Sequence, residues 1–177
     1  MKRYIMKKGS DISSEEGLEI LSERVRDYGR DPKHLGRMSR PDGYARITGP
    51  CGDTDEIFLR VRVGKIEEAK FITDGCIFSR AACNAAAHLA IGKELHECLV
   101  IDQESIMNHL GDLPASHAHC ALLASETLST AVKNYVLDHT RSAYRSTKPL
   151  KSSLRKRFTH SEQSSGKMTN KDFSKIL

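Results

Sequence analysis

The spacing of the apolar residues changes from a two-residue repeat to a helical repeat in the middle of the chain, and this change constrains the fold most. In residues 56–63, aliphatic side chains alternate with arginines, as in a strand with one buried face. Gly64-Lys65 offers a tight turn into a second strand over residues 68–73, and a third strand is predicted within residues 44–48. Because the connections are short, we expect the strands to pair antiparallel.

Helical patterns surround this predicted sheet. Residues 78–91 are rich in alanine and end before Gly92, a common helix stop. Further helices are predicted over residues 13–29 (capped by Ser13 or Ser14), 103–110 and 117–138. The predicted fold class is therefore α+β, with a small antiparallel sheet of about three strands covered on one face by helices.

The positive charge of the chain is concentrated at its C-terminal end. Residues 141–177 hold ten Lys/Arg and two Asp/Glu, whereas the other 140 residues hold eighteen and twenty-one. We therefore predict one domain over residues 1–140 and a basic, Ser-rich, flexible tail over 141–177. The acidic domain, with no Trp and few aromatic residues, makes nucleic acid an unlikely partner.

The N-terminal sequence carries no recognisable targeting signal. Its basic start lacks an apolar run of signal-peptide length, and acidic residues follow at Asp11 and Glu15. No stretch approaches the roughly 18 apolar residues of a membrane span, so no membrane association is expected. These features predict a cytoplasmic protein, in which thiols stay reduced, so its five cysteines are expected to be core residues or ligands.

Three of the cysteines lie at predicted junctions between one structural element and the next. Cys51 is within Gly49-Pro50-Cys51-Gly52-Asp53, just before a strand, and Cys76 follows Gly75 where a strand passes into a helix. Cys120 is in the first turn of the last predicted helix, after a predicted cap at Ser116. Unpaired N–H groups at such ends stabilise a thiolate, so Cys120, and more weakly Cys76, is expected to ionise more easily than a free cysteine.

Two further side chains are candidates to complete a metal site with these thiols. Asp53 follows Cys51 by two residues, so both would point the same way on an extended backbone, and His119 is adjacent to Cys120. Three thiolates with one carboxylate or imidazole bind iron less firmly than four thiolates and leave an exchangeable position. The predicted ligands are Cys51, Asp53, Cys76, His119 and Cys120.

The other cysteines and most other histidines are assigned no chemistry. Cys83 and Cys98 are predicted to be core residues. Surface or hydrogen-bonded positions are predicted for His34, His88, His96, His109, His139 and His160. The chain has no C-x-x-C pair, P-loop, H-E-x-x-H or G-x-S-x-G motif, so zinc fingers and the corresponding enzyme classes lack support.

The segments around the three cysteines resemble those of the U-type iron–sulfur cluster scaffolds, the family of IscU and the N-terminal domain of NifU. The resemblance lies in residues 49–53, in Phe71-Ile72-Thr73-Asp74-Gly75-Cys76, and in His119-Cys120 with the following Ala121-Leu122-Leu123-Ala124. The intervals of 24 and 43 residues between the cysteines also agree. Upstream, residues 31–36 are similar to the family's Asn-Pro-Arg-Asn-x-Gly turn, and the similarity covers roughly residues 20–138.

This resemblance implies a scaffold and not an enzyme. A cysteine desulfurase would deliver persulfide sulfur, and a [2Fe–2S] or [4Fe–4S] cluster would form on Cys51, Cys76 and Cys120 before transfer to apo iron–sulfur proteins. The resemblance attributes the fourth position to Asp53 or His119 and makes Cys120 the predicted first sulfur acceptor. A homodimer is a further expectation, and zinc suits the same ligands in the cluster-free form.

The chain departs from the family pattern before the last cysteine. Leu113-Pro114-Ala115-Ser116-His117 stands where IscU proteins carry the Leu-Pro-Pro-Val-Lys segment that their chaperone recognises, and it introduces His117 as an alternative ligand. One competing hypothesis is a zinc-dependent sulfurtransferase of the SufU type, which carries an insertion between the second and third cysteines that is absent here. Another is an RNA- or partner-binding module acting through the tail.

Overall fold

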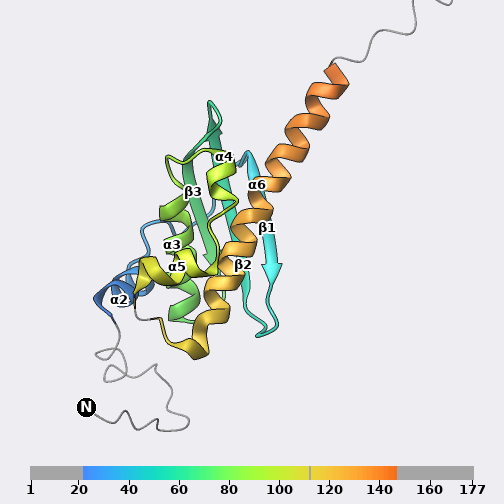
Figure 1. Cartoon of the computed structure of the whole chain (residues 1–177). Coiled ribbons are helices and arrows are strands. Elements are labelled where there is room, and N and C mark those ends of the chain that lie inside the picture. The colour runs from blue at the N-terminus through green and yellow to red at the C-terminus, as the bar shows by residue number, and fades with distance from the viewer. Residues whose placement is uncertain (1–21, 112, 147–177) are drawn as a thin grey trace, which may run out of the picture. The chain divides into compact units, whose positions relative to one another are not determined.

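The computed structural model describes residues 22–111 and 113–146 of the 177-residue chain (Figure 1). The elements follow in the order α2 (Glu23–Arg30), β1 (Gly43–Thr48), β2 (Thr54–Arg62), β3 (Lys65–Thr73), α3 (Ile77–Ala90), α4 (Leu95–Cys98), α5 (Gln103–Leu110), the 3-10 turn η1 (Ala115–His117) and α6 (Ala118–Ser146). No helix in these two ranges is long and apolar enough to cross a membrane.

The three strands form one antiparallel sheet in the order β1-β2-β3, which confirms the predicted topology. The turn between β2 and β3 is formed by Val63 and Gly64, whose φ angles of 48° and 76° are those of a two-residue hairpin turn with the twist of its strands. Strand β3 therefore begins at Lys65, three residues earlier than expected. The β1–β2 pairing ends at Thr48↔Thr54, which leaves residues 49–53 as a short loop.

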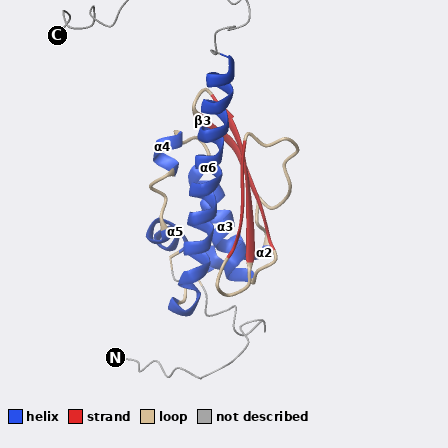
Figure 2. Ribbon diagram, turned by 90° about the vertical axis from the view of Figure 1, so that its right-hand side faces the viewer, coloured by secondary structure: helices blue, strands red, loops and turns tan. Residues whose placement is uncertain are grey.

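The helices cover one face of this sheet, as predicted. Figure 2 shows α3, α5 and α6 on one side of the strands. Helix α3 contacts the sheet largely through small side chains. Six of its alanines are 0% exposed: Ala81, Ala82, Ala85, Ala86, Ala87 and Ala90. Opposite them, Ile57, Leu59 and Phe71 are also fully buried. The alanines keep α3 close to the sheet, and its N-terminus therefore lies near the strand ends.

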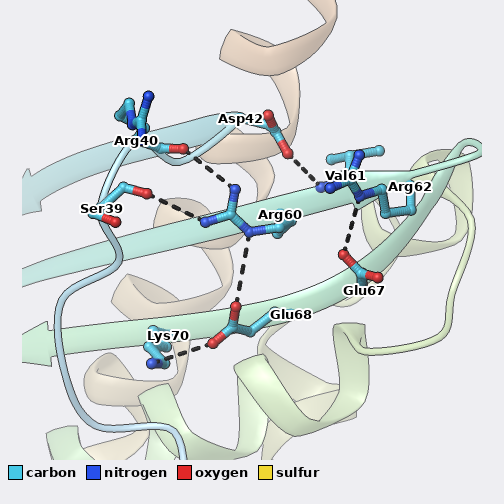
Figure 3. Close-up of polar contacts among 9 residues, drawn as sticks. All are labelled: Ser39, Arg40, Asp42, Arg60, Val61, Arg62, Glu67, Glu68 and Lys70. Atoms are coloured by element: carbon cyan, nitrogen blue, oxygen red, sulfur yellow. Dashed lines mark hydrogen bonds and ion pairs between the residues drawn. The ribbon is translucent and has the colours of Figure 1, made fainter.

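The loop before β1 is fastened to the sheet by Arg60 and Asp42 (Figure 3). The Arg60 guanidinium donates to the carbonyl oxygens of Ser39, at 3.2 Å, and Arg40, at 3.5 Å. The Asp42 carboxylate accepts a hydrogen bond of 2.9 Å from the backbone N–H of Val61, beside the bulge in the β2–β3 pairing. This loop is thus held in place by backbone groups as well as by exposed charges.

Two predicted helices have different bounds in the structure. The helix predicted over residues 13–29 is not continuous, because Ser22 has a non-helical ψ of 145°. Its hydroxyl caps α2 by accepting a hydrogen bond from the backbone N–H of Val25. Residues 13–21 of that prediction lie outside the described ranges. Helix α6 continues to Ser146, beyond the expected end at 138. Its residues 136–144 are exposed, so no apolar stripe marks that part in the sequence.

Candidate metal and cluster site

Cys51 and Asp53 lie in the loop that joins β1 to β2. The backbone N–H of Gly52 donates to the Gly49 carbonyl at 3.0 Å, and Gly52 has a φ of 92°, so the chain turns between the two side chains. The extended backbone expected from Cys51 to Asp53 is therefore wrong. The Cys51 thiol is exposed. A Cβ at Gly49 would lie 3.1 Å from the Leu123 side chain, so the loop packs against α6 one turn after Cys120.

Cys76 is the N-cap residue of α3 and is exposed. Its ψ of −178° is extended, and the first turn of the helix begins directly after it. Its sulfur forms no capping hydrogen bond of good geometry, but the backbone N–H groups of Phe78 and Ser79 are close enough to help lower its pKa. The thiol therefore lies at the positive end of a helix, as its sequence position predicted.

Cys120 is the third residue of α6 and is only 1% exposed. It lies in the first helical turn, as predicted, but the helix entry differs from the expected one. Ser116 is not a helix cap: it lies inside the 3-10 turn η1, and Pro114 precedes that turn. This turn places His117 and Cys120 at the same end of α6.

Cys76 and Cys120 come together with His117. The two sulfurs and one ring nitrogen of His117 all lie within 4.8 Å of one another. Ligand atoms around a tetrahedral zinc or iron centre are about 3.5–4 Å apart, because metal–sulfur and metal–nitrogen bonds are about 2.3 and 2.0 Å long. A contraction of about 1 Å would therefore let these three side chains share one metal centre.

Ser79 connects this group to Asp53. Its Oγ is 2.8 Å from an Asp53 carboxylate oxygen, 3.4 Å from Cys120 Sγ and 3.8 Å from Cys76 Sγ. Since a hydroxyl carries one proton, Ser79 donates to one of these partners at a time and accepts from another. Gly75 leaves the room for this arrangement: a Cβ there would lie 2.5 Å from the Asp53 oxygen and 2.6 Å from Ser79 Oγ.

The two histidines before Cys120 have different surroundings. His117 stacks on the ring of Phe78, with 3.9 Å between ring centroids, and its buried Nδ1 has no hydrogen-bond partner among the described residues. An unpartnered buried nitrogen is costly unless it binds a ligand, so this ring fits a metal site. His119 is exposed, and its Nε2 lies 3.5 Å from Cys120 Sγ.

The ionisation of the two sulfurs differs from the sequence prediction. Cys120 donates its S–H toward Cys76, and with the N–H groups at the start of α3 this lowers the pKa of Cys76 to about 5. The same contact, together with burial, raises the pKa of Cys120. The expectation that Cys120 ionises more easily than Cys76 is therefore wrong, because the sequence does not show that Cys120 is buried.

We expect Cys76 to be the most reactive thiol of the metal-free, reduced protein at mildly acidic pH. Its pKa is lowered from an ordinary value of 9 to about 5, so its alkylation rate should rise through pH 5 and stay level from pH 6 to 8. Stopped iodoacetamide reactions followed by peptide mass spectrometry measure this rate. A rate at Cys76 that still rises steeply between pH 7 and 9 would contradict the assigned thiolate.

A second buried carboxyl–thiol pair, Asp55 and Cys83, lies outside this metal-ligand group. Both are 0% exposed, and neither Asp55 oxygen forms a hydrogen bond of good geometry within the described ranges. Burial raises the pKa of Asp55 and that of Cys83. Cys83 and Cys98 are thus buried core thiols, as predicted.

The variant Asp55→Asn is expected to be more stable than the parent at pH 7. An aspartate whose folded-state pKa is raised destabilises the fold progressively as pH rises above its unfolded value near 4, and asparagine does not titrate. The gain in the free energy of unfolding should be on the order of 1 kcal/mol at pH 7 and vanish by pH 3. Urea unfolding of parent and variant at both pH values tests this. The prediction is refuted if the advantage of the variant over the parent is not larger at pH 7 than at pH 3.

The structure brings only some of the predicted ligands close together. The structure brings Cys76 and Cys120 together, with His119 beside Cys120 and Asp53 reached through Ser79. Cys51 does not belong to the group whose ligand atoms lie within 4.8 Å of one another in the described part of the chain. Sequence reasoning missed Ser79, although its position three residues after Cys76 on a helix would have placed both on one face.

This small α+β fold gathers two thiols and an imidazole at the ends of two helices, and these are the ligand types that soft metal centres use. Residues 20–142 match the family described as the NifU-like N-terminal domain. The chain belongs to this family.

Curated relatives agree with that assignment. The iron–sulfur cluster assembly scaffold protein IscU 1 of Archaeoglobus fulgidus is 34% identical over 117 residues, which cover 66% of this chain and 76% of the relative. The scaffold protein IscU of Aquifex aeolicus is 29% identical over 119 residues, which cover 66% and 76%.

Solved structures share the fold. The N-terminal part of a NifU-like protein from Brucella abortus superposes with a TM-score of 0.55 at 16% identity, covering 65% of this chain and 93% of that one. An iron–sulfur cluster assembly scaffold protein for the SUF system from Fervidobacterium islandicum gives 0.55 at 23% identity, covering 64% and 97%. These likenesses support the α+β architecture with its helices on one face of the sheet.

Proposed function

We propose that this protein is a scaffold on which an iron–sulfur cluster is assembled and from which it is passed to apo-proteins. The observation that carries the proposal is the convergence of Cys76, His117 and Cys120 in a member of the NifU-like N-terminal domain family. Iron and sulfide are substrates here, and the finished cluster is cargo. A site with two sulfurs in place and further ligands close by suits a cluster that must be loaded and released.

The thiolate–thiol pair suits the receipt of sulfur from a cysteine desulfurase. Cys76, as the thiolate of the pair, attacks the outer sulfur of the desulfurase persulfide, so a new S–S bond forms and the donor cysteine leaves as a thiolate. Cys120 keeps its proton and lies beside the newly formed persulfide. Reduction of that sulfur to sulfide requires electrons from a separate carrier, and iron enters as Fe²⁺. The sequence predicts Cys120 as the first acceptor, but because the pKa of Cys120 is raised and that of Cys76 lowered, we assign the step to Cys76.

The proposed cluster ligands are Cys51, Cys76 and Cys120. Cys51 lies on an exposed loop that packs against α6 beside the other two, so a movement of residues 49–53 would add its sulfur. The fourth ligand is proposed among His117, Asp53 and His119. Of these, His117 has a ring nitrogen within 4.8 Å of the sulfurs of both Cys76 and Cys120. Either a [2Fe–2S] or a [4Fe–4S] cluster suits this set.

Anaerobic reconstitution tests the proposal. The full-length protein, supplied with Fe²⁺, cysteine, a desulfurase and a reductant, is expected to gain visible absorbance and a Mössbauer spectrum of a cluster, and then to activate an apo-ferredoxin. A protein that acquires no iron–sulfur chromophore under these conditions would refute the scaffold function. Size-exclusion chromatography of the loaded protein would show whether assembly involves a homodimer.

A zinc-dependent sulfurtransferase is the second candidate. It is favoured by the mixed Cys, His and Asp surroundings, which suit tetrahedral zinc as well as iron, and by the fold shared with a SUF-system protein. Its signature would be stoichiometric zinc that accelerates desulfurase turnover with no transferable cluster. Both functions need reduced thiols, so we place the protein in the cytoplasm.

A further inference from the structure

Cys76 and Cys120 differ in which molecules can reach them. The Cys76 thiol is exposed at the start of α3, whereas Cys120, in the first turn of α6, is only 1% exposed. A sulfur donor on another protein can therefore reach Cys76 but not Cys120. The Cys120 thiol is left with partners inside its own chain, and the Cys76 sulfur is one of them, within 4.8 Å.

The two sulfurs are close enough to form a disulfide within one chain. An S–S bond is about 2.05 Å long, so the sulfurs need to approach each other by at most about 3 Å. Rotation of a cysteine side chain between staggered positions moves its sulfur by about 3 Å. The bond is therefore within reach of side-chain rotation.

The Ser79 hydroxyl lies beside both sulfurs. Its Oγ is 3.4 Å from Cys120 Sγ and 3.8 Å from Cys76 Sγ, and an Asp53 carboxylate oxygen is 2.8 Å away. A hydroxyl can accept a proton from one partner and donate its own to another. A proton that leaves Cys120 thus has a path to a group that departs from Cys76.

The other cysteines are placed less well for a reaction with Cys76. In the described part of the chain, none of them joins Cys76 and Cys120 in the group of mutually close ligand atoms. Cys83 is fully buried, and Cys98 Sγ lies 3.7 Å from the Ala90 carbonyl oxygen, at the other end of α3. Cys120 is therefore the thiol best placed to react with a sulfur carried by Cys76.

We propose that Cys120 is a resolving thiol that releases the sulfur received by Cys76 as sulfide. Once Cys76 carries a persulfide, Cys120 Sγ attacks Cys76 Sγ. A Cys76–Cys120 disulfide forms, the bond from Cys76 Sγ to the outer sulfur breaks, and the outer sulfur leaves with the Cys120 proton as H₂S. This inference rests on the proposed receipt of sulfur at Cys76.

The step balances without a further reactant. The outer sulfur gains two electrons and becomes sulfide, and the two cysteine sulfurs lose two electrons when they join as a disulfide. The separate electron carrier then acts on this disulfide, and a dithiol is a suitable one. Its reduction restores both thiols as cluster ligands, so sulfide is released before the cysteines bind iron.

Sulfide release from the persulfidated, iron-free, full-length chain tests the step. The chain is loaded with immobilised desulfurase and cysteine, then desalted and kept without reductant. We expect sulfide to appear as the persulfide is lost, with a Cys76–Cys120 disulfide in the peptide mass spectrum. Cys120→Ser should keep the persulfide on Cys76 and lower sulfide release at least about tenfold, because an intramolecular nucleophile is lost. Release at the parental rate in Cys120→Ser would overturn the proposal.

A second measurement replaces the persulfide by a mixed disulfide and needs no desulfurase. The full-length chain with Cys51→Ser, which leaves Cys76 as the exposed thiol, is treated with one equivalent of dithiodipyridine. Attack of Cys120 on the modified Cys76 should release a second equivalent of thiopyridone, and adding Cys120→Ser should limit release to one. Cys83→Ser is the matched control, because it also replaces a buried thiol but should keep both equivalents.

The two measurements separate this inference from the proposed function. A chain that takes no sulfur from the desulfurase but releases two equivalents of thiopyridone would count against the sulfur transfer and support the resolving role of Cys120. A mixed disulfide that persists on Cys76 while Cys120 is present, or a disulfide that joins two chains, would overturn the resolving role.

Discussion

Replacing Cys76 or Cys120 by serine is expected to lower cluster yield on anaerobic reconstitution by about 90% or more, because each change removes a sulfur from the group of mutually close ligand atoms. Cysteine thiolate is a far softer ligand than serine hydroxyl, so iron and sulfide would remain in solution or form a labile product. Yield is measured as visible absorbance per protein and as acid-labile sulfide. Full yield in either variant would contradict the assigned site.

Cys83→Ser is the matched control for Cys120→Ser. Both thiols are almost completely buried, at 0% and 1% exposure, but Cys83 is outside the ligand group. A serine at either position leaves a hydroxyl in a buried place and costs similar stability, roughly 1–3 kcal/mol. Equal loss of yield in the two variants would therefore mean that the effect comes from folding and not from ligation.

Cys51→Ser separates two arrangements of the site. If all three cysteines hold the cluster, this variant loses as much yield as the other two. If Cys76, Cys120 and His117 suffice, most of the yield remains, because Cys51 stays on its exposed loop. The first result is expected, since residues 49–53 pack against α6 beside Cys120 and leave the thiol free to move inward.

The strands and the buried helix could be predicted because each has one buried face that leaves a period in the sequence. The exceptions have no such face. Helix α4 is only four residues long and depends on a capping box between Glu94 and Glu97. The β2–β3 turn uses Val63, a fully exposed β-branched residue at positive φ, where sequence rules favour Gly64-Lys65. Local propensity could not show that choice, because strand register decides it.

The site could be predicted in its residue types and less well in its chemistry. Position at a strand-to-helix junction or in a first helical turn identified Cys76 and Cys120. Which of the two ionises depends on burial of Cys120 and on its contact with Cys76, and both arise from packing between α3 and α6. His117 is an alternative ligand from the sequence, but its place near both sulfurs, with its ring stacked on Phe78, depends on a contact between residues far apart in the sequence.

The structure makes Gly75 a determinant of that chemistry, and Gly75→Ala is expected to raise the pKa of Cys76 from about 5 toward the ordinary value of 9. The new Cβ would lie 2.5 Å from Asp53 and 2.6 Å from Ser79 Oγ, so both side chains must move. Ser79 then no longer bridges Asp53 to the two sulfurs, and the start of α3 shifts away from Cys76. Overpacking of this kind also costs about 1–3 kcal/mol of stability.

The pH dependence of Cys76 alkylation measures this change, and Gly64→Ala provides the control. Gly64 has a φ of 76° and nothing within 4 Å of an added Cβ, so alanine there strains the β2–β3 turn by about 1 kcal/mol without touching the site. The control should lose stability and keep a Cys76 midpoint near pH 5. If Gly75→Ala also keeps that midpoint, then the contacts of Asp53 and Ser79 do not set the ionisation of Cys76, and the Cys120 thiol together with the helix N-terminus accounts for it.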